Sequence, residues 1–177
     1  MYQGKPLCCL TNPFLGHESE QWKTAETLKK VMVIGGGVGG LCAAFVAAER
    51  GHSVTLFEAG HVLGGNMRLA AFPPGKGDIT NMVRAYIHRC EKDGVRIILD
   101  QEVTLELIRK ENPDAVIVAT GAKPLVLPIE GIDQPEILSG SAVLDGTCAP
   151  GKKVLVVGGG MVGCEIAALL GEQEHEV

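Results

Sequence analysis

The sequence predicts an α/β fold in which helices flank a central parallel sheet. Short apolar runs typical of buried parallel strands alternate with helical segments along the chain. Glycine-rich turns also join a strand to the next helix at two places, near residues 35–40 and 158–163. We therefore expect a Rossmann-like dinucleotide-binding domain with a central parallel sheet, followed by the start of a second dinucleotide-binding unit.

The first unit opens with an apolar run and a glycine turn. Residues 31–34 read Val-Met-Val-Ile, and Gly35, Gly37 and Gly40 then fit the pattern G-x-G-x-x-G. The first glycine allows a tight turn, the second lets a pyrophosphate approach the backbone, and the third lets the helix pack close to the strand. The helix predicted over 41–50 should direct its free N–H groups at that phosphate.

An acidic residue ends the second predicted strand. Residues 53–58 read Ser-Val-Thr-Leu-Phe-Glu, which places Glu58 close to the roughly 20-residue spacing expected of a carboxylate that binds an adenosine ribose. A carboxylate there accepts hydrogen bonds from the ribose hydroxyls and repels a 2′-phosphate. A glycine turn that served packing alone would not account for Glu58, so the pattern predicts dinucleotide binding.

The remaining elements follow in order. Residues 61–78 form a long loop rich in glycine and proline, which could wrap a ligand or lie on the surface. Helical spacing then gives residues 78–94 one apolar face, made of Ile79, Met82, Val83, Tyr86, Ile87 and Cys90. Residues 95–99 and 114–120 are predicted strands, and residues 104–112 a short helix. Three prolines mark a connector from about residue 122 to 150.

The first unit is repeated near the end of the sequence. A shift of 123 positions carries Gly35, Gly37 and Gly40 onto Gly158, Gly160 and Gly163. The counterpart of Glu58 would fall beyond Val177, so we expect a truncated second unit. The predicted organisation is an N-terminal segment over 1–28, a dinucleotide-binding domain over 29–128, and a connector with the start of a second domain over 129–177. Two such units indicate a flavin site and a nicotinamide site, and spacing alone does not say which is which.

Composition narrows the classes of partner. The net charge of −5 gives no reason to expect nucleic acid or an anionic membrane, and no apolar run approaches the roughly 20 residues that cross a bilayer. We expect a cytoplasmic protein, and its oligomeric state stays open. Cys42, Cys90 and Cys164 lie in apolar helical contexts and are expected to be buried and inert.

Four blocks of sequence resemble a known family. They are VMVIGGGVGGLCAA, GHSVTLFEAGHVLGGNM, DAVIVATGAKP and VLVVGGGMVGCEIA, and in this order they cover most of positions 30–170. The chain resembles the C-terminal nucleotide-binding part of the 2,4-dienoyl-CoA reductase, enoate reductase and trimethylamine dehydrogenase family, which are old-yellow-enzyme-type flavoproteins. The ATGAKP block alone is shared with many FAD- and NAD-binding disulfide reductases.

The resemblance implies a cofactor set for the two units. The first unit would hold FAD, and the second would hold NAD(P)H in the full-length protein. Asn66 stands where the family usually has glutamine, which shortens one contact. The implied FAD contacts beyond Gly35, Gly37, Gly40 and Glu58 are Gly39, Gly65, Asn66, Lys76, Val103, Thr120 and Gly121. The implied NAD(P)H contacts are Gly158, Gly160 and Gly163.

A motif near the N-terminus carries a more specific resemblance. In the family, Cys-x-x-Asn-Pro followed by Gly-x-Glu holds the last ligand of a four-iron cluster, just after a barrel that binds FMN. Cys9, Asn12, Pro13, Gly16 and Glu18 fit this pattern. The adjacent Cys8 is one residue out of register. The other cluster ligands and the FMN-binding barrel are expected upstream, in a missing domain or a separate subunit.

The implied function is electron transfer. Hydride would pass from NAD(P)H to FAD, and electrons would then pass through the cluster to FMN, which reduces a conjugated C=C bond. No residue of this chain is expected to act as an acid–base catalyst, and the chain alone is expected to be inactive. The alternative is a non-catalytic domain that holds ADP as a structural ligand, as trimethylamine dehydrogenase-like relatives do. The first glycine turn and Glu58 would serve either ligand, because both contain adenosine diphosphate.

Overall fold

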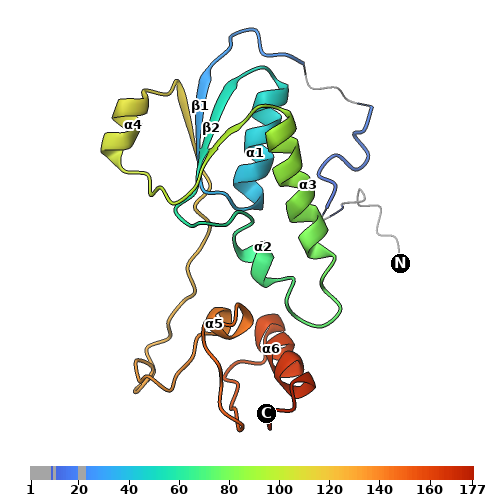
Figure 1. Ribbon diagram of the computed structural model, residues 1–177, viewed down its shortest axis with the longest axis vertical. Helices are drawn as coiled ribbons and strands as arrows, with labels where there is room; N and C mark the ends of the chain where they lie inside the picture. The colour runs from blue at the N-terminus through green and yellow to red at the C-terminus, as the bar shows by residue number, and fades with distance from the viewer. Residues whose placement is uncertain (1–8, 10, 20–22) are drawn as a thin grey trace. The chain divides into compact units, whose positions relative to one another are not determined.

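The chain divides into two compact units. The computed structural model describes residues 9, 11–19 and 23–177, and Cys8 lies outside the described residues. The first unit comprises Met1–Gly64 with Met82–Thr120, and the second comprises Gly65–Asn81 with Gly121–Val177. Figure 1 shows the elements of each unit along the chain.

A four-stranded parallel sheet forms the centre of the first unit. Its strands lie in the order β3-β2-β1-β4, and their bounds are β1 Lys30–Ile34, β2 Ser53–Phe57, β3 Arg96–Ile98 and β4 Ala115–Val118. In the register of the sheet, Met32 pairs with Thr55 on one side and with Val116 on the other. The predicted α/β fold with a parallel sheet is therefore confirmed.

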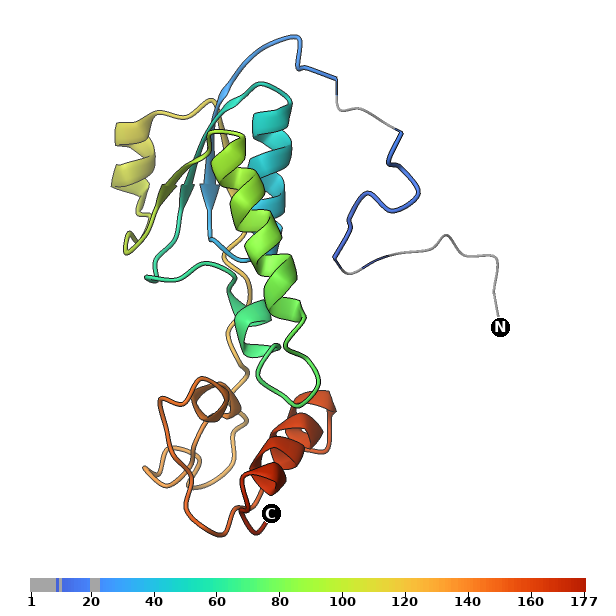
Figure 2. The same cartoon turned by 45° about the vertical axis from the view of Figure 1, so that its right-hand side comes forward.

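Helices cover both sides of this sheet. The helices α1 (Val38–Glu49) and α3 (Ile79–Lys92) lie side by side on one side, and α4 (Leu105–Glu111) lies on the other (Figures 1 and 2). The hydroxyl of Thr104 caps α4 by accepting a hydrogen bond from the Leu107 N–H at 3.2 Å. The Asn112 residue ends α4 in the left-handed conformation, with φ of 44°.

The apolar face predicted for residues 78–94 is confirmed by the packing of α3 against α1. Met82, Val83, Tyr86 and Cys90 are all buried. Tyr86 meets the fully buried Phe45 of α1 edge to face, with ring centroids 5.3 Å apart. The thiol of Cys90 donates a hydrogen bond to the Leu41 carbonyl at 3.3 Å.

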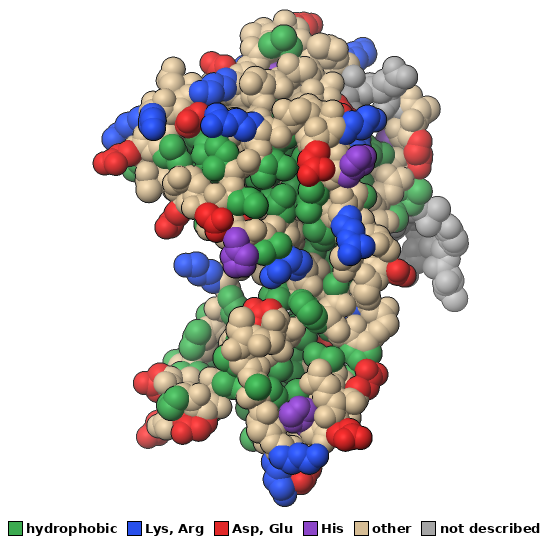
Figure 3. All heavy atoms as spheres, in the orientation of Figure 1, with side chains coloured by type: hydrophobic (Ala, Val, Ile, Leu, Met, Phe, Trp, Pro, Cys, Tyr) green, Lys and Arg blue, Asp and Glu red, His purple; other side chains and the backbone are tan. Residues whose placement is uncertain are grey.

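The second unit has a smaller core. Its helices are α2 (Asn66–Leu69), α5 (Gly140–Leu144) and α6 (Met161–Glu172). Leu144, Ile166 and Leu170 are buried together, and Leu69, Val143, Val154, Val156 and Leu169 pack against them. Residues 153–157 make one isolated parallel bridge, between Lys153 and Glu176, and no longer ladder within the described chain. Leu155 and Val157, which alternate with the packed Val154 and Val156, are exposed. Apolar side chains therefore lie at the surface of this unit (Figure 3).

The prediction that Cys164 is buried was wrong. Cys90 is buried and Cys42 is half-buried, but Cys164 is exposed. The buried face of α6 is defined by Ile166 and Leu170, which are four residues apart and share one side of the helix. A residue two positions before Ile166 projects from the opposite side. Of the helices in the described ranges, none combines the length and the apolar character needed to span a bilayer.

Candidate functional site

Two glycines of the first turn are required by packing. Gly35 has φ of 107°, and a Cβ on it would lie 2.4 Å from the Ala119 carbonyl oxygen. A Cβ on Gly40 would lie 1.9 Å from the Gly35 carbonyl oxygen. No real Cβ approaches an oxygen this closely, so both positions exclude every other residue. These two glycines hold β1, β4 and α1 in close contact.

Gly37 and Gly39 are not required by packing. Gly37 caps α1 with extended backbone angles of −70° and 174°, and a Cβ on Gly37 or Gly39 would have no atom within 4 Å apart from its chain neighbours and the backbone of its own helix. The space beside them lies at the start of α1, where the N–H groups of the first turn have no partner inside the helix. An anion in this space would accept hydrogen bonds from those N–H groups, and the positive end of the helix dipole would attract it.

The carboxylate of Glu58 is bound to the same turn. Its Oε2 accepts a hydrogen bond from the Gly36 N–H at 2.6 Å, and its Oε1 accepts one from the Gly60 N–H at 2.8 Å. These bonds fix the side chain beside the glycine turn and leave further acceptor positions on each oxygen. Reasoning from the sequence missed this bracing role, because nothing in the pattern showed that the acid would bond to the turn backbone.

The segments that follow β2, β3 and β4 are hydrogen-bonded to the glycine turn or to residues next to it. The Gly64 N–H donates to the Gly36 carbonyl at 2.8 Å, which returns the loop after β2 to the glycine turn. Leu63 is buried in that return. After β3, the Gln101 N–H donates to the Glu58 carbonyl at 3.0 Å, two residues before Val103. After β4, the Ala119 N–H donates to the Ile34 carbonyl at 2.8 Å, next to Thr120.

The candidate residues fall into two groups. The carboxyl ends of the four strands bring one group to a single edge of the sheet. This group contains Gly35, Gly37, Gly39, Gly40, Glu58, Val103 and Thr120. The remaining candidates belong to the second unit, namely Gly65, Asn66, Lys76, Gly121, Gly158, Gly160 and Gly163.

Within the second unit, the residues after Gly64 begin a short helix. Gly65 caps α2 with φ of 53°, and the exposed Asn66 is the first helical residue. The ammonium group of Lys76 forms an ion pair with Oε1 of Glu165 on α6. Sequence analysis did not single out Glu165, since an isolated acid on a helix carries no spacing signal.

The second glycine turn has the backbone geometry of the first. Gly158 has φ of 114°, against 107° at Gly35, and Gly160 has angles of −76° and 179°. A Cβ on Gly163 would lie 1.9 Å from the Gly158 carbonyl oxygen, the same distance as in the first turn.

The repeat extends past the turn. Helices α1 and α6 each have 12 residues. The bridge between Lys153 and Glu176 matches the first rung between Lys30 and Ser53. The two segments therefore share a local structure as well as a sequence pattern.

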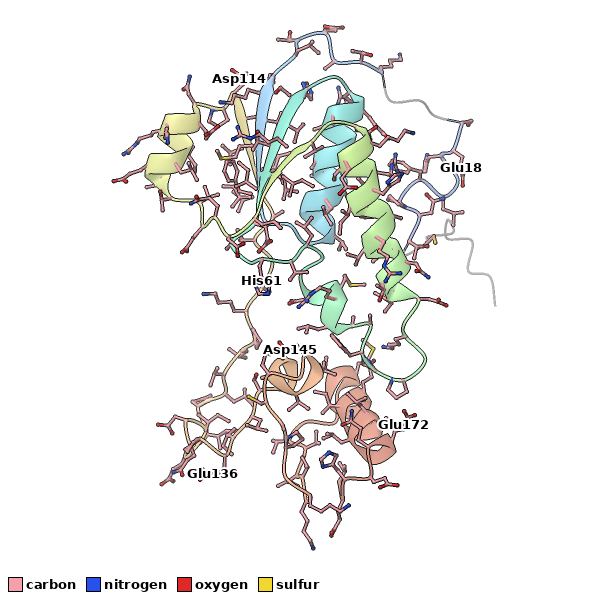
Figure 4. All side chains as sticks on the ribbon, viewed as in Figure 1. Glu18, His61, Asp114, Glu136, Asp145 and Glu172 are labelled. Atoms are coloured by element: carbon pink, nitrogen blue, oxygen red, sulfur yellow. The ribbon has the colours of Figure 1, made fainter. Side chains whose placement is uncertain are left out.

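The Cys9 motif folds into a hydrogen-bonded turn, here called the Cys9 turn (residues 9 and 11–18). Oδ1 of Asn12 accepts from the Phe14 N–H at 3.0 Å, and Oε2 of Glu18 accepts from the Gly16 N–H at 2.8 Å. Gly16 has φ of 85°, which favours glycine. Figure 4 labels Glu18 on this segment. Asn12, Gly16 and Glu18 thus shape the turn.

The thiol of Cys9 is exposed within this turn. Its Sγ accepts a hydrogen bond from the Asn12 N–H at 3.4 Å and lies 3.1 Å from the Thr11 hydroxyl. The Thr11 hydroxyl, followed by the Asn12 backbone, lowers the pKa of the Cys9 thiol from its ordinary value. In the part of the chain that the structure describes, no three His, Cys, Asp or Glu side chains are grouped as metal ligands.

Comparison with known proteins assigns most of the chain to one family pattern. Residues 29–177 match the family described as pyridine nucleotide-disulphide oxidoreductase. The matched range includes both glycine turns and Glu58.

Several longer proteins are similar to almost the whole chain. The cinnamate reductase of Clostridium sporogenes is 43% identical, over 97% of this chain and 26% of the relative. The bilirubin reductase of Mediterraneibacter gnavus is 41% identical, over 98% of this chain and 27% of the relative. A solved 2-naphthoyl-CoA reductase, in complex with 2-naphthoyl-CoA, superposes with a TM-score of 0.89 at 35% identity, over 96% of this chain and 26% of that chain. These matches confirm the resemblance read from the sequence blocks.

Proposed function

Because the chain belongs to the pyridine nucleotide-disulphide oxidoreductase family, we propose that its first unit binds FAD and serves as the electron-transfer module of an NAD(P)H-dependent flavoprotein reductase. One observation carries this proposal. The carboxylate of Glu58 is fixed by the Gly36 and Gly60 N–H groups beside an open space at the start of α1.

The residues at this place fit the adenosine diphosphate half of FAD. Gly37 and Gly39 leave room for a pyrophosphate close to the backbone, and the first turn of α1 offers it N–H donors. Glu58 retains acceptor positions for two ribose hydroxyls. A 2′-phosphate in the same place would meet its negative charge.

The protein residues of this chain bind and orient, and none is proposed as an acid–base catalyst. FAD, when bound, supplies the redox chemistry, since a flavin accepts a hydride and releases electrons singly. The turn 35–40 would hold the diphosphate, Glu58 would hold the ribose, and the backbone at Val103 would contact the adenine. Gly65, Asn66, Lys76, Thr120 and Gly121 complete the proposed FAD contacts, and Gly158, Gly160 and Gly163 form the phosphate turn proposed for NAD(P)H.

The substrate class and further cofactors are proposed from the relatives. This chain spans 26–27% of the length of the bilirubin and cinnamate reductases. We propose that the whole protein reduces a conjugated C=C bond on an FMN-binding barrel, which a further domain or subunit supplies. Cys9 is proposed as one of the four ligands of an intervening [4Fe–4S] cluster, since such clusters are held by four thiolates. The proposed domains are 1–28, 29–128 and 129–177.

Absorbance distinguishes FAD from the alternative ligand ADP. The purified chain is incubated with FAD, passed through a gel-filtration column, and its visible flavin absorbance is compared with its protein concentration. We expect one equivalent of retained flavin, which an excess of ADP displaces because both ligands share the diphosphate site. Binding of ADP without any binding of FAD would favour the non-catalytic alternative. Binding of neither nucleotide would overturn both.

A further inference from the structure

The aromatic side chain of Phe14 packs the Cys9 turn onto the first unit. The half-buried Phe14 lies in the middle of the turn, and its ring centroid is 6.3 Å from that of Phe45 on α1. Phe45 in turn contacts Tyr86 on α3. The turn is therefore continuous with the buried aromatic contact between α1 and α3.

Arg89 lies over both rings of this contact. The guanidinium carbon is 4.0 Å from the centroid of Phe45 and 5.0 Å from that of Phe14. Both distances are within the range in which a cation is attracted to the face of an aromatic ring. A planar guanidinium can stack on an aromatic face, whereas an ammonium group acts as a point charge.

An ion pair fixes the position of Arg89 independently of Phe14. The guanidinium Nη2 of Arg89 pairs with Oε1 of Glu49, near the end of α1. Both side chains are partly shielded from water. The guanidinium of Arg89 is thus held by Glu49 of α1, and Phe14 of the Cys9 turn packs against it.

We propose that Arg89 is a positioning residue that clamps the Cys9 turn to α1 and α3 through Phe14. The inference rests on the proposed function for the role of Cys9. A metal centre ligated by Cys9 would then be held against the flavin-binding unit, because Phe14 packs the turn on α1 and α3.

Hydrogen exchange at the amides of the Cys9 turn tests this inference. The N–H groups of Phe14, Gly16 and His17 are hydrogen-bonded within the turn. We expect Phe14→Leu and Arg89→Ala to accelerate their exchange roughly two- to thirtyfold, the change that corresponds to the loss of a cation–π contact. Exchange in β1 should stay unchanged. Phe14→Tyr, which keeps the aromatic face, should restore slow exchange.

Two further substitutions distinguish the stacking of Arg89 on the rings from its ion pair with Glu49. Glu49→Gln removes the ion pair but leaves both rings and the guanidinium, so most of the protection of the turn should persist. Arg89→Lys keeps the charge but loses the stacking plane, so the turn should exchange faster while α3 stays protected. Wild-type exchange rates in both Phe14→Leu and Arg89→Ala would overturn the inference. No metal or flavin takes part in these measurements, so a failure of the proposed function would leave their outcome unchanged.

Discussion

Glu58 holds the backbone of the glycine turn and is also the proposed ribose ligand. Glu58→Ala removes the acceptors proposed for the ribose and also the two bonds from the Gly36 and Gly60 N–H groups. Each hydrogen bond to a charged group is worth about 1.5–3 kcal/mol, so we expect FAD affinity to fall by at least tenfold. Titration of FAD followed by flavin fluorescence measures the change.

Glu58→Gln serves as the control for shape. It keeps the size of the side chain but replaces one acceptor oxygen with a donor, so one of the two backbone bonds is lost. We expect an intermediate affinity. Wild-type affinity in both variants would show that Glu58 does not contact the nucleotide.

The buried thiol of Cys90 should make stability fall in alkaline solution. Burial raises the pKa of Cys90 from its ordinary value of 9.0 to about 11. The unfolded chain therefore releases this proton at a lower pH than the folded chain, and the stabilising contribution is complete below pH 9 and lost as the pH rises toward 11. We expect a loss on the order of 2 kcal/mol across this window.

Urea unfolding at pH 8, 9, 10 and 11 measures this loss. Cys90→Ser keeps a donor for the Leu41 carbonyl but does not titrate in this range, so its stability should decline less than that of the wild type. Equal slopes in the two proteins would assign the decline to other groups.

At the scale of the element, the glycine turn before α1 contains two kinds of glycine. A Cβ on Gly37 meets no protein atom, whereas a Cβ on Gly40 collides with the Gly35 carbonyl. We expect Gly37→Ala to keep its folding stability but to lose most of its FAD affinity, because the methyl group would enter the space proposed for the pyrophosphate. Gly40→Ala should instead destabilise the fold by several kcal/mol, because the helix must move away from β1.

Thermal unfolding and FAD titration on the same two variants check this pair. A stable Gly37→Ala variant with wild-type affinity would place the phosphate elsewhere. A fully stable Gly40→Ala variant would contradict the close approach of α1 to β1.

How far the sequence predicts an element depends on what determines it. The strands β1 and β2 were predicted closely, since a short apolar run bounded by turn signals is typical of a buried parallel strand. The apolar face of α3 was predicted because helical periodicity is directly visible in the sequence. The exposure of Cys164 was not predicted, because it depends on which face of α6 packs against Leu144.

The same distinction holds within the candidate site. The spacing of the glycines and Glu58 is a local pattern, and it is enough to predict a nucleotide-binding turn. The bonds from Gly36 and Gly60 to Glu58, and the pairing of Lys76 with Glu165, depend on tertiary contacts that no local pattern encodes. The roles of Asn12 and Glu18 inside the Cys9 turn likewise depend on how their side chains meet the backbone.

At the scale of the whole molecule, the two units differ in the size of their cores. In the described residues of the second unit, the buried apolar side chains are Pro73, Leu144, Ile166 and Leu170. The first unit buries a larger set, which includes Met32, Leu41, Phe45 and Leu56. Stability follows buried apolar area, so we expect the second unit to unfold at a lower urea concentration than the first.

Two substitutions test this difference. Leu170→Ala should lower the first of two urea transitions, with a cost of about 2–5 kcal/mol, and leave the second in place. Leu41→Ala should lower the second transition by a similar amount. FAD should raise the transition of the first unit. A single transition that both substitutions shift equally would show that the chain unfolds as one cooperative body.

The pairing of residues 152–154 with Glu176 bears on the order in which the chain acquires its structure. The Val154 N–H donates to the Glu176 carbonyl, and the Glu176 N–H donates to the Lys152 carbonyl. The side chains of Lys153 and Glu176 are separated by 23 positions along the chain. Contacts this local form quickly, because little of the chain has to be brought together.

The pairing of β4 with β1 in the first unit joins residues that are much farther apart in the sequence. Asp114, labelled in Figure 4, accepts from the Lys30 N–H across 84 positions, at the start of the pairing between β4 and β1. On a growing polypeptide, β1, α1 and β2 can assemble soon after they are made, but β4 must be synthesised before the sheet gains its last strand. We therefore expect the local strand–helix repeat to form early in each unit, and the long-range pairing of β4 with β1 to be the slower step in the first unit.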